Sequence, residues 1–321
     1  MQRLFSSLLM LSLLLTYNSL IFADTNCSKA KTNDTVSIRY LGVGALDIHY
    51  QDQRVLTDPF YSPQSLWRII SFSAYESSKQ AIEKALGKTK QDVSAILIGH
   101  GHYDHAADVP AITDYFKDTT QILGSKSTEF LLAPNHLKQQ FISFKQNTFN
   151  KWVWIAGDWI RVKAMASEHA PQALGINLFP AIHDHELKEA PKYVWDWSQG
   201  TNITWLMDFV KTPQSNEVLK RIFIQTSASA FPVGAPDVSD SIPVDQLYLA
   251  AASFDHVENY PTGLIKYLNP KEVIFIHWEN FFKPWLDDPK ALSLINFDKL
   301  MSQKVLAGHL NSVIGQPNTC Y

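Results

Sequence analysis

The chain has 321 residues, of which 45% are hydrophobic, and its formal net charge at pH 7 is −3. This length can bury the core of one large domain or of two small ones. The near-neutral charge argues against a nucleic-acid partner held by bulk electrostatics.

Residues 1–23 have the pattern of a secretory signal peptide, with Arg3 as the first charge and an apolar stretch that ends at Ala23. We therefore expect an exported protein, periplasmic or secreted, in which residues 24–321 form one domain without a stable membrane span. The alternative is a retained anchor, because about 18 apolar residues can just cross a bilayer. The polar residues at 16–19 favour cleavage.

The two cysteines, Cys27 and Cys320, lie at opposite ends of the expected mature chain. An even cysteine count in an exported protein favours a disulfide between them. Closing so long a loop would stabilise the fold by ~4–5 kcal/mol in the chain-entropy model. Two unpaired thiols in frayed ends are the alternative.

Three short strands are expected at 36–41, 46–50 and 54–57, separated by Gly42, Gly44 and a polar turn. The third strand runs into Thr57-Asp58-Pro59-Phe60, where Asp58 could be a simple turn residue. An amphipathic helix is expected at 78–86, ending at Gly87. The aromatic segment 67–75 predicts no regular element.

The stretch 96–108 reads Ile-Leu-Ile-Gly-His-Gly-His-Tyr-Asp-His-Ala-Ala-Asp, a strand-like apolar run followed by a polar loop. In an extended segment His100 and His102 point to the same side and can share one cation. Asp104 and His105 follow where we expect a turn, so that they can reach a second cation. Imidazole nitrogen and carboxylate oxygen are donors that zinc prefers, and four such side chains in six positions predict a metal site.

His-Gly-His-Tyr-Asp-His resembles the His-x-His-x-Asp-His signature of the metallo-β-lactamase superfamily. The resemblance implies an α/β fold, a four-layer αβ/βα sandwich, with a one- or two-metal hydrolytic site at one edge. The Asp58-Pro59 opening looks like the branch of lactonases and N-acyl-phosphatidylethanolamine phospholipases. By that resemblance, Asp58 braces the metal loop from below rather than binding metal.

The remaining periodicities predict further strands and helices. Strands are expected at 121–123, 152–155, 159–166, 202–209, 221–225, 247–252 and 273–276, and helices at 107–117, 127–132, 257–268 and within 289–313.

His169 follows the 159–166 strand, and His277 follows the 273–276 strand. The resemblance supplies a third imidazole for the first metal at His169 and the last ligand of the second metal at His277. The implied ligands are therefore His100, His102 and His169 for one ion, and Asp104, His105 and His277 for the other. Zinc is the expected metal, as one or two ions, although another divalent metal would suit the same donors.

The segment 175–197 contains His183, His185 and several aromatic residues. It has two interpretations, a loop over the active site whose histidines meet substrate, or a solvated insertion with structural aromatics.

The sequence at 224–228 is Ile-Gln-Thr-Ser-Ala, and it lacks the carboxylate that bridges both metals in most superfamily members. Either the second metal is held by Asp104, His105 and His277 alone, or the protein works with one metal. The expected function is hydrolysis of a lactone, ester or phosphodiester by a metal-activated hydroxide, with Asp104 orienting the water or carrying its proton. A small-molecule or lipid-like substrate is expected. A periplasmic zinc β-lactamase and a non-catalytic binding protein with a degenerate second metal site are the alternatives.

Overall fold

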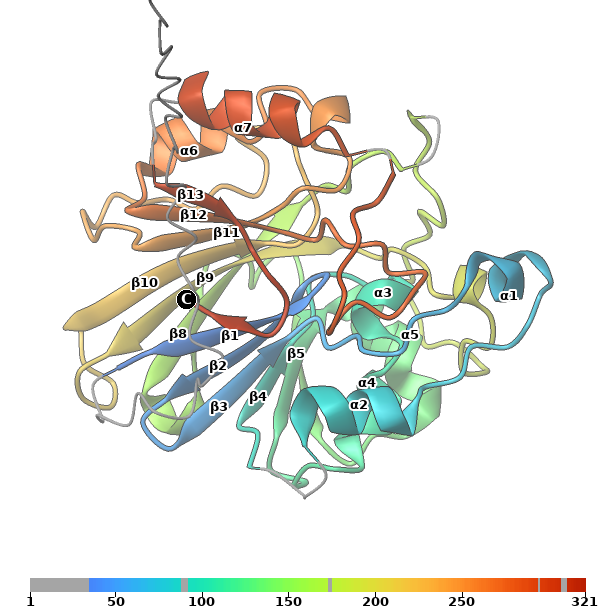
Figure 1. The fold of residues 1–321 in the computed structure, drawn as a ribbon. Helices are drawn as coiled ribbons and strands as arrows, with labels where there is room; N and C mark the ends of the chain where they lie inside the picture. Colours follow the sequence, from blue (N-terminus) through green and yellow to red (C-terminus); the bar gives the residue numbers. More distant parts are fainter. Residues whose placement is uncertain (1–34, 88–91, 173–174, 294, 307–310) are drawn as a thin grey trace, which may run out of the picture.

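The computed structural model describes residues 35–87, 92–172, 175–293, 295–306 and 311–321. Two seven-stranded sheets pack face to face, and helices lie on the outer side of each sheet (Figure 1). This α/β/β/α layering confirms the expected αβ/βα sandwich.

The first sheet joins an antiparallel meander, β1 to β3, to a run of parallel strands, β3 to β6. Its order is β14-β1-β2-β3-β4-β5-β6. The strands are β1 (Ser37–Gly42), β2 (Ala45–Tyr50), β3 (Gln53–Thr57), β4 (Ala95–Leu97), β5 (Gln121–Ser125), β6 (Gln140–Phe144) and β14 (Thr319–Cys320).

The second sheet is antiparallel from β7 to β10 and parallel from β10 to β13. Its order is β13-β12-β11-β10-β9-β8-β7. The strands are β7 (Trp152–Ile155), β8 (Ile160–Ser167), β9 (Asn202–Val210), β10 (Val218–Gln225), β11 (Gln246–Ala250), β12 (Glu272–Ile276) and β13 (Ser312–Ile314).

Helices of the first half of the chain lie beside the first sheet, and two late helices cover the second (Figure 1). The α-helices are α1 (Leu66–Ile70), α2 (Lys79–Leu86), α3 (Tyr103–Ala106), α4 (Val109–Thr113), α5 (Lys126–Leu132), α6 (Thr262–Leu268) and α7 (Phe297–Leu306). The short 3-10 helices are η2 (Ala133–Asn135), η3 (Ala156–Asp158), η5 (Val194–Asp196) and η6 (Phe254–His256).

Three apolar clusters hold the layers together. The inward faces of both sheets form the central cluster, which includes Ile48, Leu97, Trp205, Ile224 and Ile274. The outer face of the first sheet packs on α2, α4 and α5 through side chains such as Ile96, Ile82, Ile112 and Leu131. The outer face of the second sheet packs on α6 and α7 through side chains such as Leu249, Phe275, Ile265 and Leu300. Both faces of each sheet are thus covered, which explains why all nine residues of β9 are buried.

Two expected helices are wrong in their bounds. Of the helix expected at 107–117, only α4 (Val109–Thr113) is α-helical. A separate short helix, α3, precedes it, so that Asp104 and His105 lie in a helical turn rather than in a loop. Pro110 in the first turn of α4 lacks an N–H and starts a new helix instead of continuing α3. Likewise Pro261 caps α6, so that only the second half of 257–268 is α-helical.

The tail expected as helices at 289–313 is only partly helical. It holds α7, but residues 312–314 form β13 and pair in parallel with β12. The strands β6 and β14, the helix α1 and the short 3-10 helices were not expected either. Both β6 and β14 are edge strands that depend on pairing with a neighbour distant in sequence, which local patterns do not reveal.

The expected signal peptide at 1–23 and Cys27 lie outside the described residues, so export and the Cys27–Cys320 disulfide stay predictions. Cys320 lies in β14, where its Sγ is 3.9 Å from the hydroxyl of Ser37. Within the described ranges, no helix is long and apolar enough to cross a membrane.

Candidate metal centre

Five strands deliver polar residues to one edge of the sandwich. Asp58 follows β3, His100 follows β4 after two residues, His169 follows β8 after one, Thr226 follows β10, and His277 follows β12. Within each sheet these strands run in the same direction, so their carboxyl ends meet at one edge, where α/β proteins commonly build their sites.

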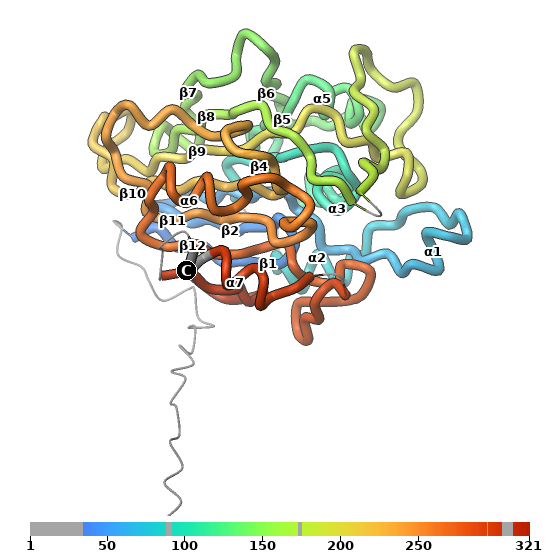
Figure 2. Tube along the Cα trace, turned by 90° about the horizontal axis from the view of Figure 1, so that it is seen from above, coloured from blue at the N-terminus to red at the C-terminus, as the bar shows by residue number. Residues whose placement is uncertain are grey.

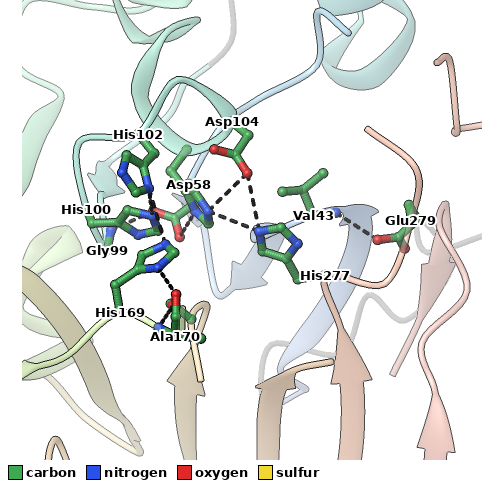
Figure 3. Close-up of polar contacts among 12 residues, drawn as sticks. Val43, Asp58, Gly99, His100, His102, Asp104, His169, Ala170, His277 and Glu279 are labelled. Carbon is green, nitrogen blue, oxygen red and sulfur yellow. Dashed lines mark hydrogen bonds and ion pairs between the residues drawn. The ribbon is translucent and has the colours of Figure 1, made fainter. Parts of the chain in front are cut away.

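His100, His102 and His169 form the first group of donor atoms. The Nε2 of His100 lies 3.1 Å from the Nδ1 of His102, which lies 3.2 Å from the Nε2 of His169. A tetrahedral zinc with nitrogen ligands at 2.0–2.1 Å would separate two such nitrogens by about 3.3 Å. The spacing therefore suits three ligands of one ion, and Figure 3 shows the three rings turned toward one another.

Asp104, His105 and His277 form the second group. The Nε2 atoms of His105 and His277 are 3.1 Å apart, and the Oδ2 of Asp104 lies 3.6 Å from the first and 3.4 Å from the second. The two groups adjoin, because the ring centroids of His100 and His105 are only 3.8 Å apart. The structure thus brings together all six side chains that the sequence named as ligands, and their binding of metal stays a prediction.

The hydrogen-bond partners of His102 and His169 explain why a cation fits between the two rings. The Nε2 of His102 faces the carbonyl of Leu178 at 3.1 Å, and the Nδ1 of His169 faces the carbonyl of Ala170 at 2.7 Å. A neutral ring carries its single N–H toward such a carbonyl, so the other nitrogen keeps a lone pair. The Nδ1 of His102 and the Nε2 of His169 therefore face each other with lone pairs and no proton between them. A cation between them would satisfy both.

Burial favours the neutral, metal-binding form of these rings. Desolvation, with the neighbouring histidines, lowers the pKa of His100 well below its usual value. Desolvation is also the main cause that lowers the pKa of His102 to about 4 and that of His169 to about 3. At neutral pH all three imidazoles are thus available as ligands.

The second group combines a carboxylate with two imidazoles, so burial and the neighbouring charges shift the pKa values of Asp104 and His105 in opposite directions. Burial raises the pKa of the Asp104 carboxyl, but His105 and His277 outweigh this and the net shift is downward. Burial lowers the pKa of His105, yet Asp104 and Asp58 outweigh it and raise the pKa overall. Desolvation lowers the pKa of His277. Asp104 is therefore an anion among imidazoles, as a ligand of a divalent cation should be.

Asp58 contacts both ends of the loop from Gly99 to His105, which carries four of the six donor side chains. Its Oδ1 accepts the N–H of Gly99 at 2.5 Å, and its Oδ2 faces the Nδ1 of His105 at 2.9 Å. This contact orients the ring and turns the Nε2 of His105 toward the second group. A Cβ at Gly99 would lie 2.6 Å from the Oγ1 of Thr226, so the close approach of the two loops requires glycine.

Glu279 and Tyr40 form a buried network behind His277 that sequence analysis missed. The Oε2 of Glu279 accepts the hydroxyl of Tyr40 at 2.7 Å and the backbone N–H groups of Val43 and Trp278, both at 3.1 Å. The hydroxyl of Tyr40 in turn accepts the backbone N–H of His277 at 2.8 Å. Burial raises the pKa of Glu279 to about 7. An acidic residue two positions after a strand-end histidine was the only available signal.

A cavity of about 480 Å³ opens onto the donor atoms. His102, Asp104, His169 and His277 line it, together with Thr226, which stands where a bridging carboxylate was expected. The rest of its wall is mostly apolar and includes Leu66, Ile69, Leu178, Phe179, Phe281 and Ile295. The volume is typical of a site for a small organic molecule.

The segment 175–197 does reach the site, although not through its histidines. Leu178 supplies the carbonyl that faces His102, and Phe179 packs beside that ring at 6.4 Å between centroids. His183 contacts the hydroxyl of Ser198 at 2.5 Å, while His185 is exposed beside Asp184. Neither histidine lines the cavity, so their contact with substrate has no support in the geometry.

The family described as "Beta-lactamase superfamily domain" matches residues 53–278. The match covers most of the chain, including both donor groups and the strands that carry them. The protein belongs to the metallo-β-lactamase superfamily.

Solved structures of the same fold include Igni18, described as a novel metallo hydrolase from the archaeon Ignicoccus hospitalis, with 12% identity and a TM-score of 0.53 over 89% of this chain and 97% of that one. An isothiocyanate hydrolase from Delia radicum gut bacteria has 13% identity and a TM-score of 0.53 over 89% and 98% of the two chains.

CmlA, a diiron β-hydroxylase from Streptomyces venezuelae, has 14% identity and a TM-score of 0.51 over 88% of this chain and 54% of that longer one. At these identities the likeness shows a common fold. No curated protein matches the chain significantly.

Proposed function

We propose that the protein is a hydrolase that binds one or two divalent metal ions through His100, His102 and His169 and through Asp104, His105 and His277, and that cleaves a lactone, ester or phosphodiester. The observation that supports this most is the 3.2 Å approach of the Nδ1 of His102 to the Nε2 of His169 beside a cavity, while the other nitrogen of each ring faces a backbone carbonyl. Divalent ions at these donors would supply Lewis acidity and lower the pKa of a water toward neutrality.

The side chains around the donors have distinct parts in this proposal. Asp104 faces the cavity, so its carboxylate would orient the attacking water or accept its proton. Asp58 would hold the ring of His105 through its Nδ1. The apolar wall, including Phe179 and Phe281, would exclude bulk water from the bond that is cleaved.

Metal counting and a substrate panel test the proposal together. The wild type should bind one or two metal equivalents and hydrolyse at least one probe among lactones, esters and phosphodiesters. His102→Ala should abolish that hydrolysis and reduce the metal content. His185→Ala is the matched control, because His185 is exposed and lies outside the cavity wall. Unchanged hydrolysis by His102→Ala would refute the proposal.

The absence of a carboxylate at Thr226 favours the main alternatives, a protein with one metal, a zinc β-lactamase, or a binding protein that lost catalysis. Losing an anionic ligand weakens the hold on a second divalent ion. Thr226→Asp should then raise the metal content from about one to about two equivalents. No metal in the wild type after expression with ample metal would favour the binding protein, and hydrolysis confined to β-lactams would favour the β-lactamase.

The metal itself is a further part of the proposal. Zinc suits a site of five histidine nitrogens and one carboxylate, but iron binds similar donors, and CmlA is described as a diiron enzyme. Elemental analysis of the purified protein distinguishes the two metals.

Export is proposed from residues 1–23 alone. A mature protein that begins near residue 24 in the periplasm or the medium supports it, and a full-length cytoplasmic protein refutes it. Mass spectrometry without reduction tests the Cys27–Cys320 disulfide in the same sample.

A further inference from the structure

Exposed apolar side chains gather in two short segments that also contribute to the cavity wall. Ten large apolar side chains are strongly exposed among the described residues, and seven of them lie in two short segments. Four lie in or next to α1, namely Leu66, Trp67, Ile70 and Phe72, which are 52–75% exposed. Three lie in the 175–197 segment, namely Ile176, Leu178 and Ile182, which are 38–65% exposed. We call these seven residues the apolar rim.

The rim and the cavity wall are continuous. Leu66 and Leu178 belong to both, because each is exposed and also lines the cavity. His102 and His169 line the same cavity. An apolar chain that enters beside Leu66 and Leu178 would thus meet a mostly apolar wall that includes Ile69 and Phe179 before it reaches the metal ligands.

The helix α1 is mostly apolar, whereas a helix surrounded by solvent is normally polar. It reads Leu-Trp-Arg-Ile-Ile, buries none of its residues and projects from the body of the protein (Figure 1 and Figure 2). Its one charged residue, Arg68, is turned back to the carbonyl of Ala74 and to Glu76, which leaves Trp67 and Ile70 as the outward face. Apolar patches of this kind mark surfaces that bind apolar partners, and tryptophan is typical of membrane interfaces.

The rim is held in place rather than loosely attached. The backbone N–H of Tyr75 donates to the carbonyl of Lys192 at 2.8 Å, and the hydroxyl of Tyr75 donates to the buried carboxyl of Asp108 at 2.8 Å. The rings of Phe72 and Trp195 lie 4.6 Å apart. The chain that follows α1 therefore adjoins the end of the 175–197 segment, and both segments contribute to the cavity wall.

The charges around the rim limit what it can bind. Segments 66–72 and 176–195 together carry three basic residues, Arg68, Lys188 and Lys192, and three acidic ones, Asp184, Glu186 and Glu189. This balance gives no attraction to an anionic surface, since such attraction needs a cluster of basic residues. Apolar contact with an uncharged or zwitterionic amphiphile fits both the charge and the exposed side chains.

We propose that the rim docks on aggregates of a zwitterionic or neutral amphiphile and that the cavity takes the aliphatic chain of one such molecule as substrate. The chemistry of cleavage rests on the proposed hydrolase function, whereas docking does not. The substrate is thus an amphiphilic ester or phosphodiester, presented by a micelle or vesicle rather than as a free molecule.

Vesicle binding tests the docking step. Wild-type protein should co-sediment with phosphatidylcholine vesicles, and Trp67→Ser/Ile70→Ser should bind at least about tenfold more weakly, because two exposed apolar side chains lose their burial. Since α1 buries no residue, this variant should keep the melting temperature of the wild type. Leu219→Ser is the matched control, because Leu219 is similarly apolar and exposed but lies on β10 outside the rim. It should bind as the wild type does.

Chain-length selectivity tests the cavity. With para-nitrophenyl butyrate and decanoate as probes, wild type should prefer the longer chain. Leu66→Ser/Leu178→Ser should lower the ratio of kcat/KM for decanoate to that for butyrate by about tenfold. A wild type that hydrolyses both esters equally and ignores vesicles refutes the amphiphile inference but leaves the hydrolase proposal standing.

His102→Ala separates the two proposals. It should lose hydrolysis yet bind vesicles as the wild type does, because the rim requires no metal. Vesicle binding through the rim by a wild type without any hydrolase activity would refute the proposed function alone. Dimers that disappear in Trp67→Ser/Ile70→Ser, together with no vesicle binding, would overturn the inference and identify the rim as a contact between two copies of this chain.

Discussion

Glu279→Ala should damage both the stability of the fold and the second donor group. The carboxylate is fully buried and its Oε2 accepts three hydrogen bonds, from Tyr40, Val43 and Trp278. Removing it leaves these donors without that acceptor in a site closed to solvent. The hydroxyl of Tyr40 can still donate to the carbonyl of Val43 at 3.3 Å, so the two backbone N–H groups are left unsatisfied. Each buried donor left unsatisfied costs ~1–3 kcal/mol, so we expect a loss of ~2–6 kcal/mol in the free energy of unfolding.

The same change should reach the metal ligands through the backbone of His277. That residue has a φ of 55°, in the left-handed region, and its N–H donates to the hydroxyl that Glu279 holds. A non-glycine residue in this conformation carries about 1–3 kcal/mol of strain that its surroundings must hold. Without Glu279 the Nε2 of His277 should move from the second group, and metal affinity there should fall by about 10- to 100-fold.

Urea unfolding with a chelator present measures the change in the free energy of unfolding. Competition with a chromogenic chelator measures the change in metal affinity. Glu279→Gln keeps an acceptor oxygen and should lose only ~1–2 kcal/mol. Tyr40→Phe should weaken metal binding at the second group without creating a cavity. If Glu279→Ala unfolds within about 1 kcal/mol of the wild type and binds metal unchanged, the network does not position His277.

Three other changes have clear expected outcomes. Asp58→Asn should lower metal affinity by about 10- to 100-fold, because the carboxylate no longer orients His105; an unchanged affinity in chelator competition would contradict this. Asp208→Ala should cost ~3–5 kcal/mol in urea unfolding, because it removes a buried carboxylate that pairs with both Arg221 and Arg161 and leaves Arg221 with Asp240 as its carboxylate partner; a loss below about 1 kcal/mol would refute that estimate. Asp47 should make stability fall in acid. Burial raises the pKa of its carboxyl, but hydrogen bonds and charge from His49 and Arg54 bring it well below its usual value. The stabilisation is therefore complete above about pH 4 and is lost as the pH falls toward the folded pKa. Urea unfolding of Asp47→Asn should lack this part of the pH dependence, and an identical slope would argue against the assignment.

Sequence patterns were sufficient wherever the information was local. The spacing of His100, His102, Asp104 and His105 and the buried run before them are properties of a few consecutive residues. The strands that carry His169 and His277 were expected from their apolar composition, and the resemblance to the superfamily named both histidines. Proline marks two of the local errors, because Pro110 in the first turn of α4 and Pro261 at the N-cap of α6 stand at helix starts that the apolar pattern placed too early.

What the sequence determined by itself was therefore the kind of donor, the order of the donors along the chain and the class of fold. Only the tertiary structure decided which of them meet, because the packing of one sheet on the other brings His102 and His169 together across 67 positions and Tyr40 and Glu279 across 239. The same holds for the cavity and for the exposure of α1. Burial depends on what packs against a segment from elsewhere in the chain, and a local pattern contains no record of that neighbour.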